Sequence, residues 1–409
     1  MGPREVTRIQ KLDPTPWSRY AHGTESRLAV LLTDASGAWL GLSHGLKSIG
    51  VPFLITTDYR QALKHSVVMV YPTVSGSVLS AEALKALAAF PRQDGTLIGF
   101  NVLGGGQNKV FGFGEAVPFG QHHQIQFSRT HPLTSSFIDL KESVIRIGNH
   151  QGPGVSGSYS YTNPGTEPLA LYEDGTAAIT HKSYGTGQAY AFGLDLGFLL
   201  QTGYNNREEG MARSYVNGYE PTLDVLLRLV AGIYRDGQRN AVTLATVPWD
   251  KSLAVMITHD VDYTQSVLNS LPYADFERSQ GLRATYFIQT KYIRDYNDAV
   301  FFNDQGVALL RELAGRNMEV ASHSVSHSQV FHRFPVGSGN EQYPSYRPYV
   351  VDAVTTRDGS ILGELRVSKF LLENLVGQRE VLSFRPGHLS NPYGLPEALE
   401  ATGFRFSSS

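Results

Sequence analysis

Three short polar clusters hold the side chains of this 409-residue chain whose types and spacing could do chemistry together. The first cluster, Thr258–Asp262, carries two carboxylates, at Asp260 and Asp262. The second, His323–His327, begins and ends with an imidazole four residues apart. The third, Phe384–His388, contains an arginine and a further histidine. A fold that brought the clusters together would place acids, metal-binding rings and a guanidinium at one site.

The acids and imidazoles form a set that suits a metal ion. Two carboxylates two residues apart on a strand point the same way, and they repel each other unless something positive lies between them. Two imidazoles four residues apart can chelate one ion if the backbone between them curls into a helical turn. One carboxylate and two histidines leave open positions for water and substrate. A guanidinium beside the remaining acid would keep it ionised and oriented.

Each cluster has an ordinary structural interpretation when it is taken alone. Asp260 and Asp262 would then belong to a turn or a solvated strand edge, and His323 and His327 to the surface of a helix. The segment after Arg385 would be a simple turn. Because all three clusters follow predicted strands, where barrel enzymes carry their reactive residues, we favour one shared site over three coincidences.

The elements around the clusters are typical of a parallel α/β barrel. Apolar runs predict strands, and amphipathic runs predict the helices between them. In such barrels the carboxyl ends of the strands face one mouth, so residues that follow different strands meet there. The predicted strands span 252–262, 283–293, 318–327 and 381–390, one more begins at Phe404, and the helices span 306–317, 359–377 and 395–403.

The first half of the chain also alternates strands and helices. This alternation predicts parallel pairing through right-handed crossovers, and hence a flavodoxin-like doubly wound sheet near residues 27–105. Ser80 is expected to cap a helix. The stretch that follows is richer in strands, with a turn at 152–158 and two hairpins over 169–197. The predicted strands span 27–34, 51–57, 65–74 and 95–106, and the helices span 39–50, 81–90 and 220–237.

The part of the chain that carries the three clusters resembles the NodB-type polysaccharide deacetylases, which are metal-dependent carbohydrate esterases. The first motif of that family supplies a base and then a metal ligand, which correspond to Asp260 and Asp262. The second motif supplies two metal-binding histidines, which correspond to His323 and His327. The third supplies an arginine that holds the base, and Arg385 matches it.

The resemblance implies a distorted (β/α) barrel over residues 250–409 and hydrolysis of an amide by a metal-bound water, with Asp260 as the base and Arg385 beside it. The implied reaction removes N-acetyl groups from an acetylated polysaccharide or oligosaccharide. The implied cofactor is one divalent metal ion, with Zn²⁺ as first choice and Co²⁺, Ni²⁺ or Fe²⁺ suited to the same ligands. We assign His388 to substrate binding.

Two other functions remain open at this point. One is a non-catalytic glycan-binding protein that retains the metal-binding residues. The other is a C–N hydrolase that acts on a small cyclic amide or ureide, although the long aromatic segment after His327 suits a larger substrate.

The chain departs from the family pattern in three ways. The two acids of the first motif are usually adjacent, and the residues after Arg385 differ from the usual ones. The last motif, which carries a general-acid histidine, is missing from the sequence. We therefore expect a barrel that is incomplete at its C-terminus and truncated there, since its sheet would keep an open edge. Otherwise His388 or His259 takes the acid role.

Residues 1–240 are similar to glutamine-amidotransferase-like domains in their strand–helix alternation and in the segment 169–197. Hydrolytic members of that family need a cysteine nucleophile, and this chain has no cysteine. We therefore expect an α/β accessory domain with added β-hairpins and a carbohydrate-binding or scaffolding role.

Composition narrows the classes of partner. The 35 basic and 37 acidic side chains leave a net charge of −2, which argues against nucleic acid as a partner. The absence of cysteine excludes thiolate metal sites. No apolar run is long enough for a transmembrane segment, and the N-terminus lacks the apolar core of a signal peptide. The resemblance nonetheless implies an extracytoplasmic location, in the periplasm, the cell envelope or the medium. The oligomeric state stays open.

The segment between His327 and Gly359 is rich in aromatic rings. The rings could stack on sugars at the barrel mouth, or they could pack into a small core of the loop's own. The residues alone do not decide between these two interpretations. The rings are those of Phe331, His332, Phe334, Tyr343, Tyr346 and Tyr349.

Overall fold

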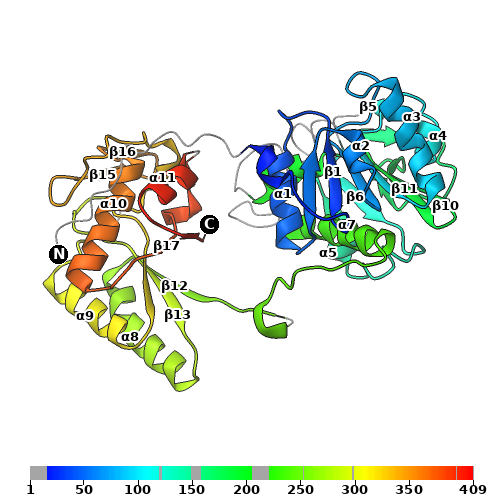
Figure 1. Ribbon diagram of the computed structural model, residues 1–409. Helices are drawn as coiled ribbons and strands as arrows, with labels where there is room; N and C mark the ends of the chain where they lie inside the picture. The colour runs from blue at the N-terminus through cyan, green and yellow to red at the C-terminus, as the bar shows by residue number, and fades with distance from the viewer. Residues whose placement is uncertain are drawn as a thin grey trace. The chain divides into compact units, whose positions relative to one another are not determined.

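In the computed structural model, the chain forms two compact α/β units (Figure 1). One unit spans Thr15–Ser252 and the other contains Leu253–Ser409. The described residues are 16–118, 122–148, 158–204, 221–251, 253–296, 299–392 and 394–408.

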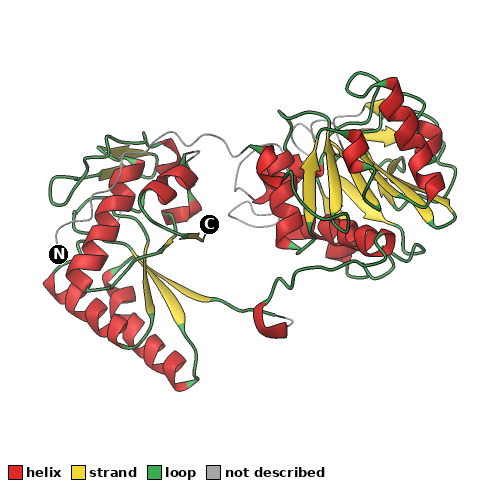
Figure 2. Cartoon of the chain, viewed as in Figure 1, coloured by secondary structure: helices red, strands yellow, loops and turns green. Residues whose placement is uncertain are grey.

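The N-terminal unit is built on one mixed sheet, whose strands are drawn in yellow in Figure 2. Its parallel part has the order β2–β1–β3–β4–β11, and the sheet continues through antiparallel β10, β9, β6 and β7. The parallel strands are β1 (Leu28–Leu32), β2 (Phe53–Thr56), β3 (Val67–Tyr71), β4 (Thr96–Phe100) and β11 (Gly187–Phe192). The others are β5 (Ala116–Pro118), β6 (Gln124–Phe127), β7 (Val144–Arg146), β8 (Tyr159–Tyr161), β9 (Ala170–Tyr172) and β10 (Ala177–Tyr184).

Helices cover both faces of the parallel strands, which is why β1 to β4 are buried throughout. One apolar cluster joins a face of the sheet to α1 (Trp39–Ser48), α6 (Leu196–Tyr204) and α7 (Asp224–Gly237). A second joins the other face to α2 (Tyr59–Ala62), α3 (Ala81–Ala89) and α4 (Asn108–Phe111). A short helix, α5 (Leu140–Ser143), precedes β7.

Several local predictions for this unit are confirmed. The Ser80 side chain accepts a hydrogen bond from the backbone N–H of Ala83 and so caps α3. Both hairpins expected over 169–197 are present, because β10 pairs antiparallel with β9 and with β11. The turn expected at 152–158 lies outside the described residues except for Ser158.

The C-terminal unit is built on a five-stranded parallel sheet with the order β12–β13–β14–β17–β18. Helices and loops pack on it around one apolar core. The strands are β12 (Ile257–Val261), β13 (Ala284–Ile288), β14 (Glu319–Ser322), β17 (Ser383–Phe384) and β18 (Phe406–Ser407). The helices are α8 (Thr264–Ser279), α9 (Asp304–Gly315), α10 (Ile361–Leu371) and α11 (Leu395–Ala401), and β15 (Tyr349–Asp352) forms a hairpin with β16 (Thr355–Arg357).

The strands of this unit are shorter than the sequence predicts. The run 252–262 was expected to be one strand, but β12 begins at Ile257 and the apolar Val255 and Met256 before it are exposed. At their other ends, β14 and β17 stop where the second and third polar clusters begin, because those residues leave the ladder to form loops, whereas β12 includes the first cluster as far as Val261. Helix α8 was not predicted, since its apolar side chains are spread around the helix and Pro272 lies inside it.

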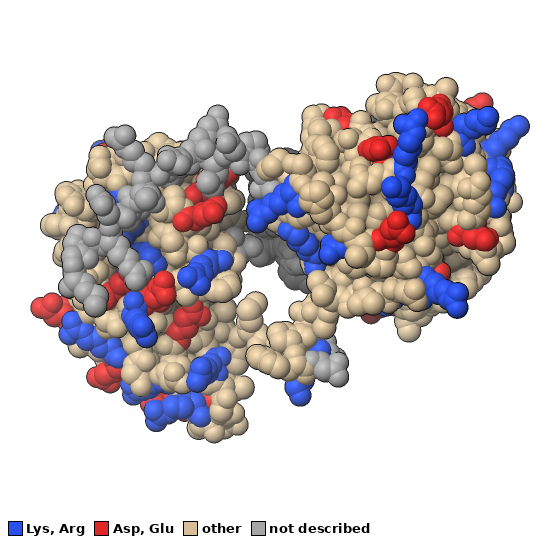
Figure 3. Space-filling model, in the orientation of Figure 1, with Lys and Arg blue, Asp and Glu red and all other residues tan. Residues whose placement is uncertain are grey.

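The charges of both units are mixed on the face that Figure 3 displays, with basic and acidic side chains interspersed. Among the described residues, no helix is both long and apolar enough to cross a membrane.

Candidate metal centre and active site

The register of the C-terminal sheet brings the polar clusters side by side at the carboxyl ends of its strands. Val261 pairs with Ile288 of β13, Ile288 pairs with Ser322 of β14, and Ser322 pairs with Phe384 of β17. The next residue along each of three of these strands is Asp262, His323 or Arg385. Parallel pairing therefore places side chains that are more than 120 residues apart in the chain at one edge of the sheet.

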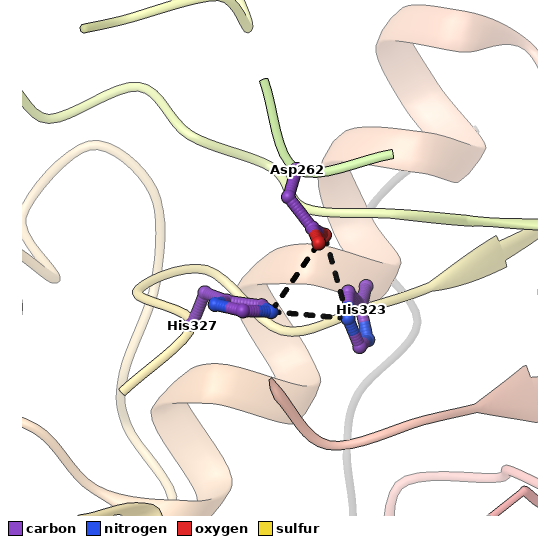
Figure 4. A group of neighbouring side chains, drawn as sticks. All are labelled: Asp262, His323 and His327. Carbon is purple, nitrogen blue, oxygen red and sulfur yellow. Dashed lines mark hydrogen bonds and ion pairs between the residues drawn. The ribbon is translucent and has the colours of Figure 1, made fainter. Parts of the chain in front are cut away.

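Asp262, His323 and His327 point toward one another (Figure 4). The Nε2 atom of His323 lies 3.4 Å from Asp262 Oδ1, and the Nε2 atom of His327 lies 3.6 Å from Asp262 Oδ2. The two Nε2 atoms are 3.2 Å apart. One ligand atom from each residue falls within 4.8 Å of the others, so a single cation can contact all three.

The electrostatics of this triad suit a cation. Burial, together with the nearby Asp260, raises the pKa of Asp262 to about 7. Burial lowers the pKa of His323 to about 4 and that of His327 well below its usual value. Asp262 Oδ1 is buried without a hydrogen-bond partner among the described residues. Two neutral imidazoles and one carboxylate form the donor set of a zinc-type site, so these residues fit a divalent metal ion.

The orientation of His323 is set from outside the triad. Its Nδ1 atom lies 2.7 Å from the backbone carbonyl oxygen of Arg385. A carbonyl oxygen only accepts, so Nδ1 carries the proton and Nε2 presents its lone pair to the triad.

His327 reaches the triad through a tight turn rather than a helical one. Ser324 and His327 both have left-handed backbone angles, with φ of 66° and 53°. The Ser324 hydroxyl oxygen accepts a hydrogen bond from the His327 N–H at 3.1 Å. Gly387 packs against the His327 ring so closely that a Cβ there would lie 2.7 Å from a ring carbon.

Asp260 lies beside the triad and is held by Arg385. The Nη1 atom of Arg385 donates to Asp260 Oδ1 at 2.7 Å. The other oxygen, Oδ2, is 3.9 Å from His323 Nε2, and the Asp260 side chain is 39% exposed. The guanidinium also donates to the hydroxyls of Thr258, at 3.0 Å, and Ser408, at 2.7 Å. Asp260 thus keeps one oxygen for solvent or substrate.

The two further histidines have different surroundings. His388 follows Gly387 in a short 3₁₀ turn, and its ring centre is 4.6 Å from that of His327. His259, the other residue considered for the acid role, does not face this site. It lies on the opposite face of β12, where its Nε2 atom is 2.6 Å from Glu277 Oε1 of α8 and its ring stacks on Tyr286.

The aromatic segment after His327 fits both interpretations in part. Phe331, Phe334 and Tyr346 are buried in the core of the unit, which excludes them as exposed sugar-stacking rings. Tyr343 is 41% exposed and Tyr349 is 45% exposed. Sequence reasoning missed the buried carboxylate of Glu364, which contacts the turn between the two triad histidines. An acid in an amphipathic helix carries no local signal of such a contact.

Comparison with known proteins finds a family model that matches this unit. Residues 250–407 match the family model of polysaccharide deacetylases, which confirms the resemblance inferred for this part of the chain. A search among curated protein sequences found no match.

Three solved structures illustrate the similarity. A family 4 carbohydrate esterase from Streptomyces lividans, in complex with acetate, is 22% identical over 37% of this chain and 60% of its own, with a TM-score of 0.24. A family 4 pseudoenzyme from Bacillus anthracis is 14% identical over 37% of this chain and 41% of its own, with a TM-score of 0.26. The carbohydrate deacetylase Agd3 is 11% identical over 93% of this chain and 65% of its own, with a TM-score of 0.40. The chain thus spans less than two thirds of each.

Proposed function

We propose that this chain, whose residues 250–407 match the polysaccharide deacetylases, is a metal-dependent hydrolase that removes N-acetyl groups from a polysaccharide or glycan. The observation that carries the proposal is the triad of Asp262, His323 and His327 beside a separate acid, Asp260, that is paired with Arg385. Three ligands for one cation and a second carboxylate outside the ligand set are what hydrolysis by an activated water requires.

In this proposal Asp262, His323 and His327 hold one divalent cation, with zinc as the first choice and cobalt, nickel or iron suited to the same atoms. Such a cation, when bound, makes water nucleophilic at neutral pH and polarises the acyl oxygen. Asp260 takes the proton of the attacking water at Oδ2, because Oδ1 already accepts a hydrogen bond from Arg385. This hydrogen bond from Arg385 orients the Asp260 carboxylate.

The water oxygen forms a bond to the acetamide carbonyl carbon, and the C–N bond then breaks. The proton taken by Asp260 passes to the leaving nitrogen, so the products are acetate and a free amine on the sugar. His388 contacts the substrate next to the triad, as its place beside His327 suggests. Exposed Tyr343 and Tyr349 are candidates for stacking on neighbouring sugar rings.

We further propose that the N-terminal unit is an accessory domain with a flavodoxin-like fold that resembles the amidotransferase-like domains. Its parallel strand order β2–β1–β3–β4–β11 supports the flavodoxin-like fold. The absence of cysteine argues for scaffolding or glycan binding in place of amidotransferase chemistry. An acetylated polymer of the cell envelope or the medium as substrate would place the protein outside the cytoplasm.

The direct test is acetate release by the zinc-loaded full chain from a panel of N-acetylated oligosaccharides, with small cyclic amides and ureides in parallel. The proposal predicts acetate release from a glycan, loss of that release with a chelator, and recovery with added Zn²⁺. Asp262→Asn, which removes a ligand charge while keeping side-chain size, is the matched control and is expected to be inactive. Glycan binding without acetate release would contradict the proposal and indicate a non-catalytic glycan-binding protein.

A further inference from the structure

A fully buried carboxylate lies directly behind the turn that joins the two triad histidines. Glu364 belongs to the first turn of α10 and is 0% exposed. Its Oε2 atom accepts hydrogen bonds from two consecutive backbone N–H groups, those of Val325 at 2.7 Å and Ser326 at 2.8 Å. Val325 and Ser326 are two of the three residues between His323 and His327.

The other oxygen of Glu364 is held as well. Tyr346, whose ring is buried, lies with its hydroxyl 2.9 Å from Glu364 Oε1 and accepts a hydrogen bond from the Ser360 N–H at 3.1 Å. Ser360 is the N-cap of α10, so Glu364 also lies near the positive end of the helix dipole. The carboxylate is therefore oriented from two sides before it meets the turn.

The turn needs such a partner. Strand β14 ends at Ser322, so the N–H groups of Val325 and Ser326 have no place in the sheet ladder. Two of the five residues from His323 to His327 have left-handed backbone angles, which side chains with a Cβ adopt at an energetic cost. Buried N–H groups that lost their acceptor would drive the backbone toward another conformation. That change would separate the Nε2 atoms, which now lie 3.2 Å apart.

We infer that Glu364 is a positioning residue that holds the turn 323–327 in the shape that aims both histidines at one cation, and thereby sets the affinity of the site for metal. The inference deepens the proposed function and rests on its metal triad. Glu364 does not touch the triad atoms themselves; its effect passes through the backbone of Val325 and Ser326.

The test measures the binding of Co²⁺ alone to the full chain, by its visible absorption, in the wild type and in variants of Glu364. Glu364→Ala leaves two buried N–H groups without an acceptor, and we expect it to weaken Co²⁺ binding about 10- to 100-fold, as loss of groups that orient ligands typically does. Glu364→Gln keeps an oxygen of the same reach, and we expect it to stay within about threefold of the wild type. Glu364→Asp shortens the side chain and should resemble Glu364→Ala.

Glu319→Ala is the matched control. Glu319 begins β14 and accepts hydrogen bonds from the hydroxyls of Thr285 and Ser383, each at 2.6 Å, at the amino end of the same strand. Its loss should lower the melting temperature without changing the affinity for Co²⁺ or the absorption spectrum. A general loss of stability would therefore not mimic the expected result.

Wild-type affinity and spectrum in Glu364→Ala would overturn the inference. If Glu364→Ala does not fold, Glu364→Asp decides, and wild-type affinity there would overturn it equally. A wild-type chain that binds Co²⁺ tightly, responds to Glu364 as described and releases no acetate would support this inference while contradicting the proposed function.

Discussion

The backbone carbonyl of Arg385 accepts a hydrogen bond from His323 Nδ1 at 2.7 Å, while the Arg385 side chain donates to Asp260 at 2.7 Å. One residue thus orients both a proposed metal ligand and the proposed base. The two functions use different parts of that residue, the main chain and the guanidinium. Substitution of the side chain can therefore separate them.

Arg385→Ala is expected to lower kcat/KM for acetate release by at least about 100-fold, since Asp260 would lose the donor that orients its carboxylate. The affinity for Co²⁺ should change by less than about threefold, because the carbonyl that orients His323 remains. Steady-state kinetics and a Co²⁺ titration on the same preparation measure both quantities. Loss of metal comparable with that of a ligand variant would show that the two functions cannot be separated.

Substitution of a triad residue should abolish tight metal binding. Asp262→Ala, His323→Ala and His327→Ala each remove one of three ligand atoms, and we expect metal to be lost on dialysis, together with activity. Metal content by elemental analysis is the measurement, with His259→Ala as the control because His259 lies on the other face of β12 against Glu277. Retention of one ion per chain by all three variants would rule out this triad as the site.

The affinity for metal should depend on pH through Asp262. Its pKa is raised to about 7 in the metal-free protein, so below that pH a cation must displace a proton. His323, with a pKa lowered to about 4, is already neutral there and adds no second proton. As the pH falls from about 7 to about 5, we expect the dissociation constant for Co²⁺ to rise about tenfold per pH unit. Titrations across this range test the slope, and an affinity independent of pH would contradict the assignment.

His388 should affect the substrate and leave the metal in place. His388→Ala removes a ring that lies beside the ring of His327. His388 is not one of the ligands proposed for the cation. We expect kcat/KM to fall by about 10-fold or more, as for loss of a substrate contact, with unchanged metal content. Kinetics with oligosaccharides of increasing length check this expectation. A loss of metal from the variant would instead assign His388 to the metal site.

The sequence predicted the site more fully than the loops around it. Asp262, His323 and Arg385 could be placed together because each follows a run of strand type, and parallel strands bring their carboxyl ends to one edge. Chelation by His323 and His327 was expected to require a helical turn between them, whereas left-handed backbone angles at Ser324 and His327 close the turn. Glu364 could not be predicted, because its partners are backbone N–H groups about 40 residues away.

The surroundings of His259 and of the aromatic segment also could not be predicted from the sequence, because they depend on tertiary packing. Alternation along β12 puts His259 on the face opposite Asp260, but which face carries the site depends on tertiary packing. Phe331 and Phe334 are buried, while Tyr349 is exposed. Composition alone does not distinguish rings that fill a core from rings that line a rim.

Asp260 is the proposed base and Asp262 a proposed metal ligand, and paired measurements on Asp260→Asn test this assignment of roles directly. Metal content and acetate release are determined on one sample of the zinc-loaded variant. We predict one ion per chain, as in the wild type, and turnover reduced by about 10²- to 10⁴-fold, because the amide cannot accept the proton. Full turnover in Asp260→Asn would contradict the role of Asp260 as the base, and loss of its metal would contradict its place outside the ligand set.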